Sequence, residues 1–220
     1  MSPRIYEDRR DAGRSLVPEI QRCDLKAPIV LGLPRGGIPV AYEIASAINA
    51  PLDLLVVRKL GAPSQPELAL GAIASGGVRI LNERLVANLL GDDDLVIEEL
   101  VAKETEELLR RDKAYRGDRP YPDLRGMAVI LADDGMATGA TMRAAAEAVA
   151  SRDPAKVIVA VPTASADAVR LVSKLVDQVI CLDIPSPFFA VGGFYRNFGQ
   201  TTDEEVRSLL RQAWGELPDE

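Results

Sequence analysis

Residues 129–141 join an apolar run, two adjacent acids and a turn of small residues, in the order Val-Ile-Leu-Ala-Asp-Asp-Gly-Met-Ala-Thr-Gly-Ala-Thr. An apolar run this short is typical of a strand buried inside a parallel sheet. After the turn, Met142, Ala145 and Val149 recur with the spacing of one helical face. The order of strand, turn and helix therefore predicts one unit of an α/β fold, with the acids at the carboxyl end of the strand.

The same alternation recurs along the chain. Further strand patterns cover residues 29–33, 52–57, 157–161 and 179–182, and further helical patterns cover residues 38–48 and 165–174. Strands that alternate with helices predict an α/β fold with a doubly wound, mainly parallel five-stranded sheet. Two short strands are expected at residues 71–74 and 78–80, and a long charged helix at 92–114 whose charges form a solvated face.

We expect a single domain over residues 1–220, because no linker divides the chain and its 47% hydrophobic content can form a substantial core. Residues 1–25 would hold an amphipathic N-terminal helix, residues 28–185 the core, and residues 186–220 a C-terminal extension. Within the extension, Thr202-Asp203-Glu204-Glu205 is a capping box, which predicts a C-terminal helix.

Composition excludes several classes of protein. The chain has no histidine, which removes Ser-His-Asp and Cys-His catalysis and His-based zinc sites. Its net charge of −7 argues against nucleic-acid binding. The sequence contains no apolar run long enough for a membrane span and no secretory leader, so we expect a cytoplasmic protein without a membrane partner. Cys23 and Cys181 have no paired-motif spacing and suit buried positions.

The turn after the acids suits a phosphate group. Small residues let backbone N–H groups close around an anion at the start of a helix, and Thr138 and Thr141 add hydroxyl donors. Asp133 and Asp134 offer only acceptors, which fit the vicinal hydroxyls of a ribose, a metal-bridged polyanion, or both. The alternative is an ordinary strand, turn and helix capped by Asp.

This stretch resembles the phosphoribosyl-pyrophosphate (PRPP) signature of the type I phosphoribosyltransferases. The resemblance implies the fold of that family, in which a mobile hood loop covers the sheet. It implies that Asp133 and Asp134 bind the ribose 2′- and 3′-hydroxyls. It also implies that the 5′-phosphate lies in a loop made by Ala137, Thr138, Gly139, Ala140 and Thr141. Ala132 and Gly135 are smaller than is usual in the signature. Members that act on 6-oxopurines carry an acid in place of Ala137, so its absence argues against hypoxanthine or guanine.

A second loop, Pro34-Arg35-Gly36-Gly37, follows the first predicted strand. Its glycines expose N–H groups, and Arg35 supplies a planar charged fork for phosphate oxygens. By resemblance this is the pyrophosphate loop, in which the peptide before a glycine is often cis, and Arg58 and Lys59 lie near the same pyrophosphate. Turn formation alone, and a solvated pair at a strand end, are the alternatives for these two segments.

Residues 61–71 are rich in turn formers, which predicts a mobile loop, and by resemblance this is the hood. Glu67 within it resembles the glutamate that adenine-type members place near the acceptor base, although a surface glutamate is ordinarily just solvated. The aromatic residues between Phe188 and Phe198 could stack on a planar base, or they could close the core or a dimer interface.

Together with these features, the resemblance implies transfer of ribose 5-phosphate from PRPP to a small nitrogenous base, with release of pyrophosphate. The catalytic residues would be Asp133, Asp134, Glu67 and Lys59. Mg²⁺ would be held mainly through PRPP, with no direct protein ligand, and the protein would be a homodimer. A non-catalytic PRPP- or nucleotide-binding regulator is the main alternative, but Arg35 and Lys59 suit neutralisation of a leaving group. A metal-dependent hydrolase would need further acids at ligand spacing.

Overall fold

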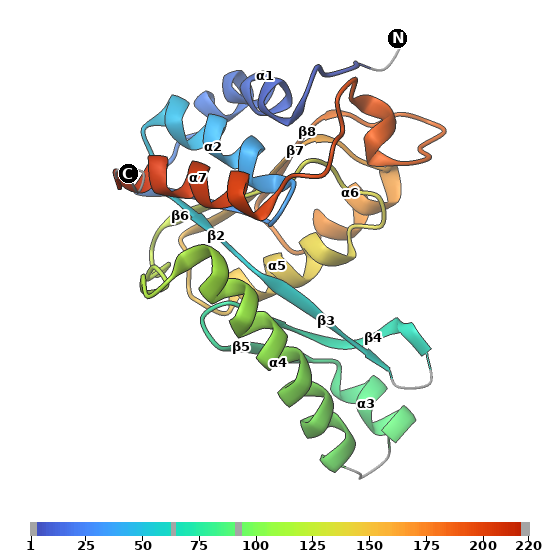
Figure 1. Ribbon diagram of the computed structural model, residues 1–220. Helices are drawn as coiled ribbons and strands as arrows, with labels where there is room; N and C mark the ends of the chain where they lie inside the picture. The colour runs from blue at the N-terminus through green and yellow to red at the C-terminus, as the bar shows by residue number, and fades with distance from the viewer. Residues whose placement is uncertain (1–3, 63–64, 91–93, 217–220) are drawn as a thin grey trace.

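The computed structural model describes residues 4–62, 65–90 and 94–216. Its centre is a parallel sheet of five strands in the order β2-β1-β6-β7-β8, shown in Figure 1. The strands are β1 (Pro28–Gly32), β2 (Leu52–Leu54), β6 (Ala128–Ala132), β7 (Lys156–Thr163) and β8 (Gln178–Asp183). The predicted doubly wound α/β fold with five parallel strands is therefore confirmed.

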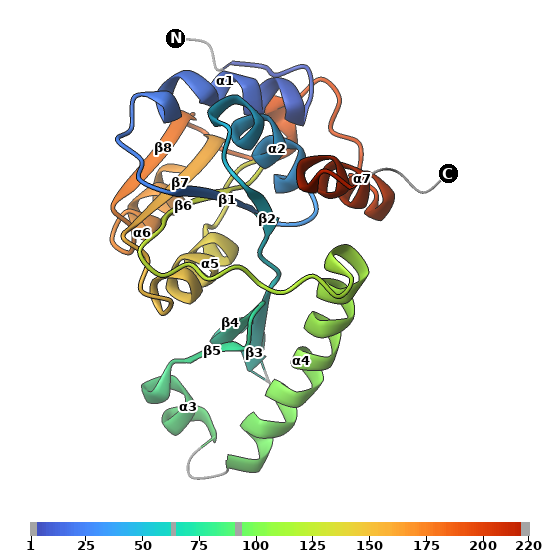
Figure 2. The ribbon, with the colours of Figure 1, turned by 90° about the vertical axis from the view of Figure 1, so that its left-hand side faces the viewer.

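Helices cover both faces of this sheet. Figure 2 shows α1 (Arg9–Gln21) and α2 (Gly37–Ile48) on one face, with α7 (Asp203–Trp214) beside α2, and α5 (Ala140–Ala150) and α6 (Ala166–Val172) on the other. Successive residues of a strand point to opposite faces, so Val30 and Ile130 pack in one hydrophobic cluster and Ile29 and Val129 in the other. This double burial explains why the strands are continuous apolar runs.

The sheet order reverses between β1 and β6. From β1 the chain first moves outward to β2, and it later returns to place β6 on the other side of β1. In open α/β sheets ligands bind beyond the carboxyl ends of the strands at such a reversal. The two loops that flank it are residues 33–36 and 133–139, which are the two segments expected to bind PRPP.

A second, antiparallel sheet contains β3 (Val57–Ala62), β4 (Gln65–Ala74) and β5 (Val78–Leu81). Together with α3 (Glu83–Leu90) and α4 (Asp94–Arg116) it forms an arm that extends away from the central sheet (Figures 1 and 2). The predicted strand over residues 52–57 is thus divided between β2 and β3, and α3 had no counterpart among the predicted helices.

The prediction of a mobile loop over residues 61–71 was wrong for most of its length. Residues 65–71 belong to β4, where Gly71 pairs with Leu60 and Ala69 with Gly61. Residues 63–64 lie outside the described residues. The strand forms because Leu70 is fully buried with Ala62 against α4, and this burial outweighs the turn preference of the nearby residues.

Segments near the two ends of the chain lie side by side over the central sheet. The backbone N–H of Tyr6 donates to the carbonyl of Phe194 at 2.8 Å, and that of Arg196 donates to the carbonyl of Tyr6 at 2.9 Å. We call residues 6–9 and 194–199 the terminal strap. The hydroxyl of Tyr6 also donates to the carbonyl of Pro162 in β7, which holds the strap at the carboxyl edge of the sheet.

Beyond the strap, the capping-box prediction is confirmed, since Thr202 accepts from the N–H of Glu205 at the start of α7. Across the described ranges, the helices are too short or too polar for a membrane crossing.

Candidate active site

Asp133 and Asp134 follow β6 directly, at the reversal in sheet order. An oxygen of Asp133 accepts from the N–H of Asp134 at 2.9 Å, and Oδ2 of Asp134 accepts from Nε of Arg9 at 2.7 Å. Burial raises the pKa of the Asp133 carboxyl well above its usual value, and the adjacent Asp134 charge raises it further. Burial also raises the pKa of Asp134, and the Arg9 guanidinium opposes that rise.

The Arg35 loop packs directly against these acids. A Cβ on Gly36 would lie 2.1 Å from Oδ2 of Asp134, and one on Gly37 would lie 2.6 Å from the carbonyl oxygen of Ala132. Both positions therefore need glycine for the loop to approach β6 this closely. The loop contains a cis peptide between Pro34 and Arg35, one residue earlier than the bond before a glycine that the sequence suggested.

The small-residue turn opens α5, as predicted, although the helix begins at Ala140 rather than at Met142. Gly139 has φ +75°, and a Cβ there would lie 3.1 Å from the Cβ of Ala168 at the start of α6. Ser165 donates its hydroxyl to the carbonyl of Ala137 at 2.6 Å, which ties the turn to the next loop. Gly139, the N-cap of α5, makes no side-chain capping hydrogen bond, and the N–H of Ala140 donates to the Thr138 hydroxyl at 3.3 Å. The free N–H groups at the start of a helix are the groups that an anion site uses.

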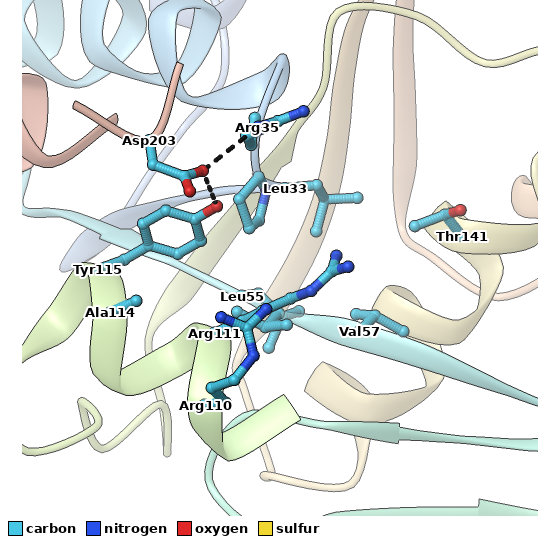
Figure 3. Close-up of a pocket in the computed structure, with 12 residues that line it drawn as sticks. Leu33, Arg35, Leu55, Val57, Arg110, Arg111, Ala114, Tyr115, Thr141 and Asp203 are labelled. Carbon is cyan, nitrogen blue, oxygen red and sulfur yellow. Dashed lines mark hydrogen bonds and ion pairs between the residues drawn. The ribbon is translucent and has the colours of Figure 1, made fainter. Parts of the chain in front are cut away.

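A cavity of about 280 Å³ lies beside the Arg35 loop and is lined by three arginines, Arg35, Arg110 and Arg111. Thr141, in the first turn of α5, lies across the cavity from Tyr115 of α4 (Figure 3). Arg110 and Arg111 come from α4, and both donate to Glu107. Sequence reasoning missed them because it took the charges of this helix for a solvated face.

One carboxylate enters the same cavity. Oδ1 of Asp203 accepts from the hydroxyl of Tyr115 at 2.7 Å and from Arg35 at 3.4 Å (Figure 3). The Tyr115 hydrogen bond and the charge of Arg35 lower the pKa of Asp203. Burial and Asp203 raise the pKa of Tyr115 to about 12. The capping box predicted the helix that begins at Asp203 but carried no signal that this residue reaches the cavity.

The other predicted residues lie on the arm. Arg58 donates to Glu104 of α4 through Nε at 2.8 Å, and Leu60, two residues on, is buried on the same side. Lys59 lies on the opposite face of β3, together with Val57. Val57 is the β3 residue that lines the cavity. Glu67 lies in β4, and its side chain falls outside the described part of the structure. The roles of these residues remain predictions.

The fold and the site define an α/β protein with two adjacent acids and a helix-opening turn of small residues at the sheet reversal, an arrangement suited to a phosphorylated sugar or nucleotide. The sequence model of the phosphoribosyl transferase domain family matches residues 5–197. The chain therefore belongs to the phosphoribosyl transferase domain family.

Two Mycobacterium tuberculosis proteins, "Putative phosphoribosyl transferase MT0597" and "Putative phosphoribosyl transferase Rv0571c", are each 46% identical over 96% of this chain. The chain spans 47% of the length of each, about half of the curated relatives that it matches. The crystal structure of TT1426 from Thermus thermophilus shares 42% identity and a TM-score of 0.86, covering 94% of this chain and 98% of that one.

A hypothetical protein from Neisseria gonorrhoeae, solved with bound ppGpp, shares 12% identity and a TM-score of 0.52, over 96% of this chain and 98% of that chain. At this identity the likeness concerns the fold alone.

Proposed function

We propose that this protein is a Mg²⁺-dependent phosphoribosyltransferase that transfers ribose 5-phosphate from PRPP to a nitrogenous base and releases pyrophosphate. The observation that carries the proposal is the close contact between the Gly36–Gly37 turn and the acids Asp133 and Asp134. This contact places a loop suited to pyrophosphate against two acceptors suited to ribose hydroxyls. The 5′-phosphate turn follows the acids within the same segment.

The chemistry requires a bond from C1 of the ribose to the pyrophosphate oxygen to break while a bond to the acceptor nitrogen forms. Positive charge develops on the sugar as the leaving group departs. Carboxylates of Asp133 and Asp134 stabilise that charge and orient the ribose through its hydroxyls. The N–H groups of the turn from Ala137 to Thr141 hold the 5′-phosphate at the positive end of α5.

Pyrophosphate would occupy the arginine-lined cavity. Arg35 provides a bidentate donor for its oxygens, and Arg110 and Arg111 add positive charge from α4. Arg58 and Lys59 remain candidates if the arm moves when PRPP binds. Mg²⁺ would neutralise the developing charge on pyrophosphate. Within the described residues no three acidic or cysteine side chains gather as a metal cage. The cation would be carried mainly by PRPP oxygens and water, which are the hard oxygen ligands that Mg²⁺ prefers.

For the acceptor we propose an amino-bearing heterocycle related to adenine. Ala137 offers no acid to a 6-oxopurine, and Glu67 on the arm would approach an acceptor nitrogen if β3 and β4 close over the site. A cytoplasmic location and a homodimeric assembly belong to the same proposal.

The proposal is tested by calorimetry of PRPP with Mg²⁺ against the wild type and the Asp133→Asn/Asp134→Asn double variant. A hydrogen bond to a charged group contributes about 1.5–3 kcal/mol, so loss of both acids should weaken PRPP binding about 10²-fold or more while the circular dichroism spectrum stays native. Equal PRPP affinity in the two proteins would refute the site.

A further inference from the structure

The two adjacent acids have different surroundings. The carboxylate of Asp134 is held by Arg9 in an ion pair of 2.7 Å, with side-chain exposures of 16% and 12%. Asp133, in contrast, accepts from the backbone N–H of Asp134. Asp134 is thus partnered by a cation from α1, whereas the Asp133 carboxylate is half-buried beside that pair.

Resting on the proposed function, we infer that Arg9, through Asp134, is a positioning residue for the acid pair that binds the ribose. Arg9 and Asp134 would then act as one unit that fixes the acid loop. The terminal strap would then help to hold the PRPP site in its binding geometry.

The contacts of Arg9 support a fixed position. Its Nη1 donates to the carbonyl of Gly199 at 2.7 Å, and its guanidinium lies 4.0 Å from the ring centroid of Phe198. Both partners belong to the terminal strap. Three directional contacts on one guanidinium, two of them hydrogen bonds, hold its plane against Asp134.

The strap also holds the backbone of the acid loop. Tyr195 donates its hydroxyl to the carbonyl oxygen of Asp134 at 2.6 Å and stacks on Phe198 with ring centroids 4.9 Å apart. The Cβ position of Gly36 lies 3.0 Å from Nε of Arg9, so the pyrophosphate loop packs on the same ion pair. Asp134 is therefore held by three groups, which are the Arg9 side chain, the Tyr195 hydroxyl and the Arg35 loop.

The ion pair of Arg9 with Asp134 also reduces the repulsion between the two adjacent acids. Two carboxylates in sequence repel each other when both are buried and ionised. Arg9 offsets one of the two charges, which leaves the Asp133 carboxylate able to accept hydrogen bonds from a sugar. A cation that served only to stabilise the fold would have no effect on PRPP affinity once folding is intact.

The test compares PRPP affinity, by calorimetry with Mg²⁺, in five folded variants: Asp133→Asn, Asp134→Asn, Arg9→Gln, Arg9→Lys and the double variant Arg9→Gln/Asp134→Asn. Arg10→Gln is the matched control, because Arg10 follows Arg9 in α1 but pairs with Glu43 instead. Circular dichroism and thermal melting verify that each variant folds.

We expect Asp133→Asn and Asp134→Asn each to lose about 10²-fold in affinity, because each removes a charged acceptor for a ribose hydroxyl. Arg9→Gln should lose about tenfold, and the double variant no more than Asp134→Asn alone, because Arg9 acts through Asp134. Arg9→Lys should regain most of the loss, and Arg10→Gln should match the wild type.

Two results would overturn the inference. Losses that multiply in the double variant would mean that Arg9 acts on the ligand directly. An unchanged Arg9→Gln would make the ion pair purely structural. Failure of the wild type itself to bind PRPP would instead refute the proposed function, so the two failures are distinguishable.

Discussion

One methyl group added at Gly36 should displace the acid pair without changing any charge. Gly36 has φ −62° and ψ −29°, which alanine adopts freely, so the substitution tests space rather than backbone conformation. A Cβ at this position would lie 2.1 Å from Oδ2 of Asp134, whereas ordinary contacts begin near 3.4 Å. The carboxylate or the loop must therefore move by about 1.3 Å, which is 3.4 Å less 2.1 Å.

Oδ2 of Asp134 is also the atom that accepts from Arg9, so moving it disturbs that ion pair. A misplacement of about 1 Å in a site can cost about 10²-fold, and overpacking typically costs about 1–3 kcal/mol of stability. For Gly36→Ala we expect PRPP affinity, measured by calorimetry with Mg²⁺, to fall about 10²-fold. The Tm should fall by roughly 2–4 °C for each kcal/mol lost.

Gly193→Ala is the matched control, because among the described residues nothing lies within 4 Å of its Cβ position. It should bind PRPP like the wild type. Wild-type affinity in Gly36→Ala would refute the argument that the glycine turn and the acids share one binding surface.

Three further predictions concern other parts of the site. Gly139→Val should abolish binding of ribose 5-phosphate, because φ is +75° and a Cβ would lie 3.1 Å from Ala168; titration that gives wild-type affinity would show that this turn does not hold phosphate. Arg110→Gln with Arg111→Gln should weaken pyrophosphate binding about tenfold or more while sparing ribose 5-phosphate, and equal losses for both ligands would place the arginines elsewhere in the mechanism. Burial raises the pKa of Asp133, so the stability that this group contributes is complete below the ordinary carboxyl pKa of about 4 and is lost as the pH rises through the raised value. Asp133→Asn should therefore gain in Tm over the wild type as the pH rises above about 4, and a difference that does not change with pH would contradict the raised pKa.

The central sheet and the position of the acids could be predicted from local sequence. Strands buried on both faces are continuous apolar runs, and the order from Val129 to Thr141 places acids and turn at the carboxyl end of one of them. The loop at Arg35 follows another such strand. Since parallel strands end at the same edge, the meeting of the two loops follows from the fold class.

The arm could not be predicted in the same way. Its strands depend on pairing between residues such as Leu60 and Gly71, and on burial of Leu70 against a helix that comes later in the chain. The residue propensities around 63–66 favour a turn. Propensities do not include contacts between residues that are far apart in the sequence. The cavity arginines were missed for a related reason, because a charged helix looks the same whether its side chains face water or a binding site.

The position of Arg9 depends on contacts between residues that are even farther apart in the sequence. Its neighbours Gly199 and Phe198 come from the other end of the chain, and its partner Asp134 comes from the middle. Nothing in the amphipathic pattern of α1 distinguishes Arg9 from Arg10. Only the pairing of the two halves of the terminal strap shows which arginine meets the acids.

The most direct test of the account is turnover with PRPP, Mg²⁺ and a panel of nitrogenous bases, measuring pyrophosphate and the ribosylated base in the same reaction. The account predicts equal amounts of the two products with an adenine-like or other amino-bearing heterocycle, little with hypoxanthine or guanine, and none in the Asp133→Asn/Asp134→Asn variant. Glu67→Gln should slow turnover of the preferred base. Efficient turnover of hypoxanthine or guanine would contradict the acceptor assignment, and PRPP left intact with every base would contradict the transferase itself.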